Sequence, residues 1–251
     1  MNPERAALSL RPKHTLTEDV TEQLRDAIFR GHFAPGERLS EEQLARSLGI
    51  SRGPIREAFV RLEREGLIAS QANRRTVVTR LSRRDLAEVF TIRLALECLA
   101  VQYAVHYAQP ADFAAMAANS TALEEAVARG ITEREAATLD VSFHDLIYRA
   151  SRHQHVIDAW SNIRSQVYLF LLSRNLANPD FRERGIVQGH NEILEALANR
   201  NEKRAIRCIE EHLRAAYNYI LKNYPDQGEG TEPLVGLLGS LASLDEAGER
   251  R

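Results

Sequence analysis

The stretch GISRGPIREAFVRLEREGL, from Gly49 to Leu67, decides the fold of the first part of this chain. Ser51 is a residue type that caps helix N-termini, so we expect a helix to start there. Pro54 falls in its first turn, where the missing N–H has no acceptor within the helix anyway. Apolar residues then recur at helical spacing and predict one face packed on a core: Ile55, Phe59 and Leu62.

The outer side of this helix start carries polar and basic residues, namely Ser51, Arg52, Gly53 and Arg56. The arginine fork can bond both O6 and N7 of a guanine, and helix N–H groups can bind a phosphate. From Arg52 to Arg84 there are nine arginines and three glutamates, a local charge of +6 in a chain of net charge −2. The alternative reading is a set of solvated surface charges. The local charge excess favours a surface for a polyanion.

The residues on both sides complete a known arrangement. The pattern predicts a first helix over about residues 18–30 and a second one that opens with an S-x-x-Q capping box at Ser40 and Gln43. After Gly66, the segments LIAS and TVVTR bracket a polar loop and predict a two-stranded hairpin with Arg74 and Arg75 at its tip. The order predicts a winged helix-turn-helix domain over 15–80.

The remainder of the chain repeats apolar residues every three or four positions, which predicts helices alone. We therefore expect a mainly α protein in which an all-α helical-bundle domain over 83–225 follows the winged helix. We expect an N-terminal tail over 1–14 and a weakly helical or disordered tail over 226–251. The helices are predicted at about 83–108, 111–129, 133–151, 154–174, 184–199 and 202–223.

Composition narrows the class of protein. A chain of 251 residues with 44% hydrophobic residues can bury a sizeable core. We see no continuous apolar run of about 20 residues and no signal peptide, so we expect a cytoplasmic protein with no membrane partner. Cys98 and Cys208 are too few for a disulfide framework, and we expect both to be buried thiols.

Four residues of the helical part are candidate metal ligands. Asp140 and His144 are four apart and so share one helical face. His190 and His212 each flank the apolar stripe of a different helix, and imidazole is a favoured ligand of zinc, nickel and similar ions. Three helices could bring these four side chains to one point. The alternative is that each is an ordinary half-buried side chain with a local hydrogen bond.

Two arginines lie on largely apolar helix faces. Arg93 is followed one turn later by Glu97, which could pair with it, whereas Arg164 has no evident local partner. A buried guanidinium needs an anion. We therefore expect these two arginines to bind a small organic acid, with the Arg93–Glu97 ion pair as the alternative for Arg93.

The N-terminal part resembles the DNA-binding domain of the GntR family of bacterial transcriptional regulators, through PGERL, the Ser-Arg pair, PIREA and LE-EGL. The resemblance implies a dimer on a short palindromic operator, with Ser51, Arg52 and Arg56 as helix contacts. Gly53 stands where the family usually has threonine. Arg75 stands where its wing usually has glycine, so we expect Arg75 to reach a phosphate instead.

The helical part resembles the FadR-type C-terminal domain of this family. It carries R-ALE from Arg93, D-x-x-FH from Asp140, and the motifs around His190 and His212. In the metal-binding members an Asp and three His hold a divalent ion, so the resemblance implies that Asp140, His144, His190 and His212 bind a metal, zinc or nickel. The positions that this metal leaves open would take the carboxylate of the effector.

We therefore expect a homodimeric regulator that is not an enzyme. It would bind palindromic double-stranded operator DNA, and a metal-bound organic acid would control that binding. One alternative is a metal-dependent hydrolase, although no further acid is placed like the glutamate of H-E-x-x-H. The other alternative is a regulator whose metal is purely structural and which has no effector.

Overall fold

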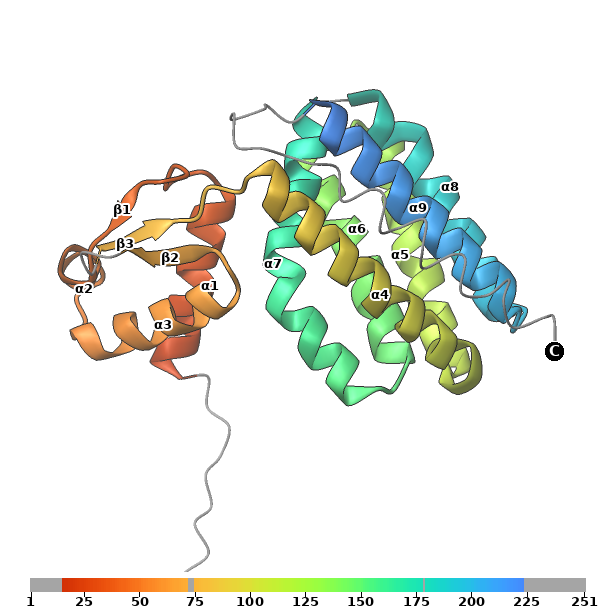
Figure 1. The fold of residues 1–251 in the computed structure, drawn as a ribbon, viewed down its shortest axis with the longest axis horizontal. Helices are drawn as coiled ribbons and strands as arrows, with labels where there is room; N and C mark the ends of the chain where they lie inside the picture. Colours follow the sequence, from red (N-terminus) through yellow and green to blue (C-terminus); the bar gives the residue numbers. More distant parts are fainter. Residues whose placement is uncertain (1–14, 72–74, 178, 224–251) are drawn as a thin grey trace, which may run out of the picture. The chain divides into compact units, whose positions relative to one another are not determined.

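The computed structural model describes residues 15–71, 75–177 and 179–223 (Figure 1). The two expected tails and Arg74 at the wing tip lie outside these residues. The chain divides into two compact units, the first ending at Thr79 and the second beginning at Arg80. The protein is mostly helical, as the sequence predicts.

The described residues of the first unit form helices and a small sheet. The helices are α1 (Leu16–Phe29), α2 (Glu41–Leu48) and α3 (Arg52–Arg64), and the strands are β1 (Arg38–Leu39), β2 (Ile68–Gln71) and β3 (Arg75–Val78). The sheet is antiparallel with order β1-β3-β2, and Ile68 pairs with Val78. The hairpin β2–β3 is the predicted wing. Strand β1 was not predicted, because two residues are too few to show a period.

Side chains cap the starts of α1 and α2. Thr15 and Glu18 form a capping box at α1, and the Ser40 hydroxyl accepts a hydrogen bond from the Gln43 N–H. Helix α2 ends at Gly49 with φ of 67°, a left-handed conformation that glycine adopts without strain. Ser51 occupies the N-cap position of α3, but its side chain makes no cap hydrogen bond. Our expectation of a side-chain cap was wrong there.

The core of the first unit fixes the orientation of α3. Ile55 and Leu62 have no exposed surface and Phe59 is buried, and α1 packs on the same side of α3. Arg25 of α1 makes two hydrogen bonds to the Glu65 carboxylate at the end of α3. The predicted inward stripe is therefore confirmed, and the opposite side of α3 is left to solvent.

The second unit is a bundle of helices. These are α4 (Arg83–Tyr107), α5 (Pro110–Ala128), α6 (Glu133–Ala150), α7 (Gln154–Ala177), α8 (Pro179–Ala198) and α9 (Glu202–Asn223). Helix α4 packs on α6, α7 and α9, and α8 packs on α5 and α9 (Figure 1). Ser82 and Asp85 cap α4 reciprocally. By length and composition alone α4 is long and apolar enough to cross a membrane, and half of its most apolar window is buried inside the unit.

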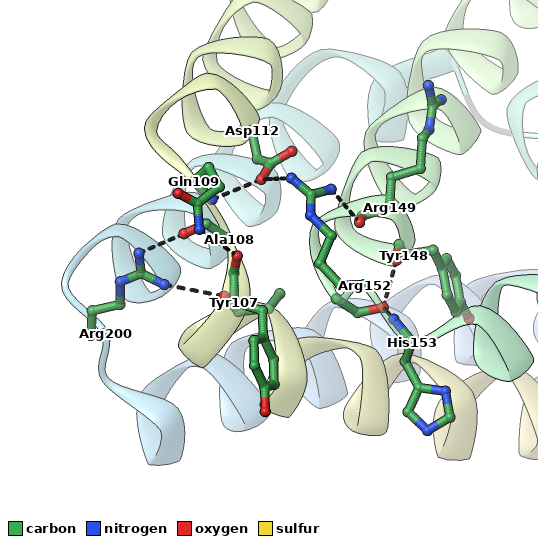
Figure 2. A network of polar contacts seen from close by, with 11 residues as sticks. Tyr107, Ala108, Gln109, Asp112, Tyr148, Arg149, Arg152, His153 and Arg200 are labelled. Atoms are coloured by element: carbon green, nitrogen blue, oxygen red, sulfur yellow. Dashed lines mark hydrogen bonds and ion pairs between the residues drawn. The ribbon is translucent and has the colours of Figure 1, made fainter.

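Two arginines form hydrogen bonds that link helix ends in this bundle (Figure 2). Arg200, which follows α8, donates to the carbonyls of Ala104, Val105 and Ala108 at the end of α4. Arg152, which follows α6, donates to the Arg149 carbonyl and to the Asp112 carboxylate of α5. Both arginines have positive φ, 54° and 56°, a conformation that costs energy outside glycine. The carbonyls at a helix C-terminus attract cations, which accounts for arginine at these positions.

Candidate metal centre and nucleic-acid interface

The N-terminus of α3 presents basic side chains to solvent. Arg52, Gly53 and Arg56 are exposed, while Ile55 between them is fully buried. This is the placement that the sequence predicts for residues that reach base edges. Ser51 is exposed as well, and its hydroxyl is not used as a helix cap.

A carboxylate that the sequence analysis did not single out lies beside these arginines. Glu41 in the first turn of α2 accepts from Arg56 at 3.2 Å and 3.4 Å, and Arg52 Nη2 lies 3.5 Å from the same carboxylate. Only about a quarter of the Glu41 side chain is exposed. The two candidate reading arginines therefore share one acidic partner.

These residues line a groove of about 500 Å³ in the first unit. Arg38 of β1 and Arg75 of β3 contribute to its walls together with Arg52, Arg56 and Ser40. The arginines between Arg52 and Arg84 are divided between the two units. Arg61 approaches Glu18, and Arg84 belongs to α4 in the other unit, where it pairs with Glu88.

The four candidate metal ligands meet in the second unit. Asp140 and His144 come from α6, His190 from α8 and His212 from α9, and one ligand atom from each lies within 4.8 Å of the others. His144 Nε2 lies 3.3 Å from Asp140 Oδ1, and His190 Nε2 lies 3.9 Å from the same oxygen. Three of the four residues are fully buried, and His212 is partly exposed.

Packing around the cluster fixes the imidazole rings. Phe143 stacks on His190 with ring centroids 4.0 Å apart and an interplanar angle of 7°. Gly189 leaves room for the His212 ring, because a Cβ at Gly189 would lie 2.5 Å from His212 Nδ1. His144 Nε2 is buried and makes no hydrogen bond among the described residues. A buried ring nitrogen without a hydrogen bond is costly, and a metal ion would satisfy it.

Behind His144 lies a buried ion pair. Glu97 of α4 accepts at 2.6 Å from His144 Nδ1 and at 2.5 Å from Arg93 Nε. The predicted alternative for Arg93, a local ion pair with Glu97, is therefore present. The sequence did not indicate the bond to His144, because α4 and α6 meet only in the folded bundle.

The electrostatics of this cluster set the charges of its members. Burial raises the pKa of Glu97, but the charges of Arg93 and His144 outweigh it and lower that pKa to about 2. Burial lowers the pKa of His144, and the Glu97 carboxylate reverses this, so the net shift is upward. Removal from bulk solvent, followed by the neighbouring His190 and His144, lowers the pKa of His212 well below its usual value. His212 is thus neutral at pH 7, the form that binds metal.

Arg164 has a partner on another helix, which the sequence did not indicate. Its Nε and Nη2 make a two-point contact with both oxygens of Asp145, at 2.8 to 3.0 Å. The Trp160 indole N–H donates to the same carboxylate at 2.7 Å. Asp145 sits on α6, so its pairing with α7 could not be seen in the spacing of either helix.

The two cysteines also differ from expectation. Cys98 and Cys208 are free thiols, but each is only partly buried. Neither belongs to the four-residue cluster, whose donors are three imidazoles and one carboxylate.

The first unit is a winged helix-turn-helix with an exposed arginine pair on α3, and the second is a helical bundle with a buried cluster of metal-binding residue types. This combination defines a class of proteins, the DNA-binding transcriptional regulators. The chain belongs to the GntR family. The model for "Bacterial regulatory proteins, gntR family" matches residues 16–78, and that for the FCD domain matches residues 88–215. The family consists of transcriptional regulators, so the protein is a regulator and not an enzyme.

Its relatives are similar over most of their length. The chain is 32% identical to the uncharacterized HTH-type transcriptional regulator YdhC of Bacillus subtilis, over 82% of this chain and 91% of the relative. It is 30% identical to the probable D-xylose utilization operon transcriptional repressor of Paenarthrobacter nicotinovorans, over 78% and 86%. The solved structure of E. coli McbR/YncC superposes with a TM-score of 0.72 at 26% identity, covering 84% of this chain and 99% of that one.

Proposed function

We propose that this regulator senses a small carboxylate-bearing metabolite at a metal ion in its helical domain and that the metabolite changes its affinity for a palindromic operator. The observation that carries the proposal is the meeting of Asp140, His144, His190 and His212 from three helices. We take the domains to run from 15 to 80 and from 83 to 225.

The donor set suits a divalent transition metal. Three imidazoles and one carboxylate are ligands that zinc and nickel accept, and His144 Nε2 is buried without a hydrogen bond among the described residues. A four-donor set leaves positions open on a five- or six-coordinate ion. When bound, the ion supplies a Lewis-acidic position for a carboxylate.

Arg93 is the residue we assign to the effector. Its Nε is used by Glu97, while its Nη2 is buried and makes no hydrogen bond among the described residues. A carboxylate held beside the cluster would satisfy this donor. We leave Arg164 out of the effector site, because Asp145 already takes its guanidinium in a two-point contact.

For the DNA-binding surface we propose Ser51, Arg52, Gly53 and Arg56 at the start of α3, with Arg74 and Arg75 in the wing. The exposure of Arg52, Arg56 and Arg75 around one groove supports this assignment. Arginines at a helix start can reach guanine edges in the major groove. Arg75 is suited to a phosphate contact.

We propose a cytoplasmic homodimer, because a palindromic operator needs two DNA-binding units about 34 Å apart. Helix α4 offers a candidate contact between the two copies. Ile92, Tyr103 and Tyr107 fall on one face of α4 and are exposed by 46%, 36% and 53%. Large apolar side chains on one helix face are typical of a surface that a partner covers.

The competing proposal is a purely structural metal. In that case the ion would stabilise the bundle, and no ligand would control the DNA-binding domain. The two proposals predict different responses to organic acids, so one set of measurements separates them.

The first experiment is elemental analysis of purified, untagged protein beside His190→Ala. We expect about one metal atom per chain in the wild type and almost none in the variant. A panel of small organic acids is then titrated while the fluorescence of Trp160 and the affinity for operator DNA, selected from random sequence, are measured. No metal in either protein after zinc and nickel are offered would refute the metal site. Metal without any acid that alters operator affinity would favour the structural ion.

A further inference from the structure

Glu97 is fully buried in α4 and divides its two oxygens between two different partners. Oε2 accepts from His144 Nδ1 at 2.6 Å, and Oε1 accepts from Arg93 Nε at 2.5 Å. His144 is itself a member of the four-residue cluster, and its other ring nitrogen, Nε2, lies 3.3 Å from Asp140 Oδ1. The carboxylate therefore lies directly behind one candidate ligand.

The bond to Glu97 sets the tautomer of His144. A carboxylate only accepts hydrogen bonds, so Nδ1 must carry the proton. In the neutral ring the lone pair is then on Nε2, which lies 3.3 Å from Asp140 Oδ1. The rings of His190 and His212 neighbour that of His144, with centroids 5.5 Å and 5.3 Å away. The free lone pair of His144 is thus on the nitrogen that lies beside Asp140, another member of the cluster.

A comparison within the same domain indicates that Glu97 does more than pair with Arg93. Arg164 and Asp145 form the ordinary two-point contact, in which the fork of the guanidinium bonds both carboxylate oxygens. Arg93 instead bonds one oxygen of Glu97 and leaves its own Nη2 without a hydrogen bond among the described residues. The second oxygen of Glu97, Oε2, accepts a hydrogen bond from His144 instead.

We propose that Glu97 is the positioning residue of the metal centre: it holds the His144 ring in the orientation and tautomer that present Nε2 to the ion, and Arg93 in turn holds Glu97. This rests on the metal site of the proposed function. Hydrogen bonds behind metal-binding histidines fix the ring and raise its basicity, and their loss costs about 10- to 100-fold in metal affinity.

The test is Glu97→Gln, which keeps the shape of the side chain and removes its charge. Zinc dissociation constants are measured by competition with a chromogenic chelator, with Glu88→Gln on the exposed side of α4 as the control. We expect a 10- to 100-fold weaker affinity in Glu97→Gln and no change in Glu88→Gln. Binding by Glu97→Gln within twofold of the wild type would overturn the proposal. If the wild type itself binds no zinc, the proposed metal site has failed instead.

A second pair of variants covers the case in which Glu97→Gln does not fold, because it leaves Arg93 buried without its counter-ion. Arg93→Met alone keeps the bond from His144 to Glu97, and Arg93→Met/Glu97→Gln removes both charges. Because Arg93 holds Glu97, we expect Arg93→Met to bind zinc more weakly than the wild type, and the double variant, which also loses the carboxylate bonded to His144, to lose more, 10- to 100-fold in all. Equal affinity in both would contradict a positioning role.

A spectroscopic measurement separates positioning from a general effect on stability. Long-range ¹H–¹⁵N correlation spectra report the tautomer of each histidine in the metal-free protein at a pH high enough to leave the His144 ring neutral. We expect His144 to carry its proton on Nδ1 in the wild type and to populate the Nε2-protonated tautomer in Glu97→Gln. An unchanged single tautomer in the variant would overturn the proposal.

Discussion

The Arg56 guanidinium lies against the Glu41 carboxylate, with Nη2 3.2 Å from Oε2 and Nε 3.4 Å from Oε1. Arg52 brings its own Nη2 to 3.5 Å from the same Oε2. The side chains proposed to read the operator therefore share an acidic partner. A phosphate or a guanine edge has to compete with Glu41 for both guanidiniums.

Replacing this carboxylate should strengthen binding to DNA of any sequence. We expect Glu41→Gln to lower the dissociation constant for a random duplex about two- to fivefold, because exposed ion pairs contribute roughly 0.2–1 kcal/mol. The removal of a negative charge near the phosphates acts in the same direction. Fluorescence anisotropy with a labelled duplex at several salt concentrations measures the change.

Glu42→Gln is the matched control for Glu41→Gln. Glu42 lies in the same first turn of α2 and pairs with the exposed Arg46, so both variants change the charge at the helix start equally. We expect Glu42→Gln to change affinity for random DNA by less than Glu41→Gln does. Equal effects of the two variants would show that net charge alone is responsible.

Truncating Arg52 or Arg56 should weaken binding to the operator more than binding to random DNA. We expect Arg52→Ala and Arg56→Ala each to weaken operator binding by ~1–3 kcal/mol if they contact base edges. Random DNA should lose less, because phosphate contacts carry no sequence information. Arg61→Ala serves as the control, since Arg61 lies near the other end of α3 and approaches Glu18. Unchanged operator affinity in Arg52→Ala and in Arg56→Ala would refute this docking.

The first unit could be predicted closely because its signals are local. The proline at the third position of α3, the cap at Ser40 and the glycine at position 49 each act within one turn, and the buried stripe of α3 repeats every three to four residues. Strand β1 and the pairing of Glu41 with Arg56 could not be predicted in the same way. They depend on how separate elements pack, which no spacing within one element reveals.

The cluster in the second unit illustrates the same division. Its four members could be named because each sits beside the apolar stripe of its own helix, and the resemblance to the FadR-type domain indicated that they belong together. The residues that hydrogen-bond to the candidate site residues could not be predicted. Glu97 is 47 residues from His144, and Asp145 is 19 residues from Arg164. Those contacts exist only because α6 packs on both α4 and α7.

Adding one methyl group at Gly189 should damage the cluster. A Cβ there would lie 2.5 Å from His212 Nδ1, far inside contact distance, so the His212 ring has to move. We expect Gly189→Ala to weaken zinc binding by at least about tenfold, the lower end of the loss seen when ligand positioning fails. Competition with a chromogenic chelator gives the dissociation constant.

Gly185→Ala controls for the gain in helix propensity. Gly185 is exposed on the same helix, and alanine favours a helix over glycine by ~1 kcal/mol. We expect this variant to be at least as stable as the wild type and to bind zinc with the same affinity. Unaltered zinc binding in Gly189→Ala would mean that the His212 ring, as found here, is not in its metal-binding position.

Removal of the metal should lower thermal stability. A ligand that binds only the folded state adds about 2.7 kcal/mol when present at 100 times its dissociation constant. We therefore expect a strong chelator to lower the Tm of the wild type by several degrees and added zinc to restore it. His106→Gln, at an exposed histidine outside the cluster, should respond like the wild type, whereas His190→Ala should show no chelator effect. A Tm that is indifferent to chelator in the wild type would contradict a bound ion.

The Asp145–Arg164 contact should contribute to stability and not to metal binding. Both side chains are partly exposed, 15% for Asp145 and 36% for Arg164, so we expect a coupling energy of about 0.5–1 kcal/mol from a double-mutant cycle of Asp145→Ala and Arg164→Ala in urea.

Trp160 provides an independent readout of this contact, because its indole donates to Asp145 and the chain has a single tryptophan. Asp145→Ala should shift the Trp160 emission, whereas Arg164→Ala should shift it less, since the indole hydrogen bond remains. Zinc affinity should stay within twofold of the wild type in both variants. If Arg164→Ala instead abolished the response to an organic acid while leaving stability unchanged, Arg164 would belong to the effector site after all.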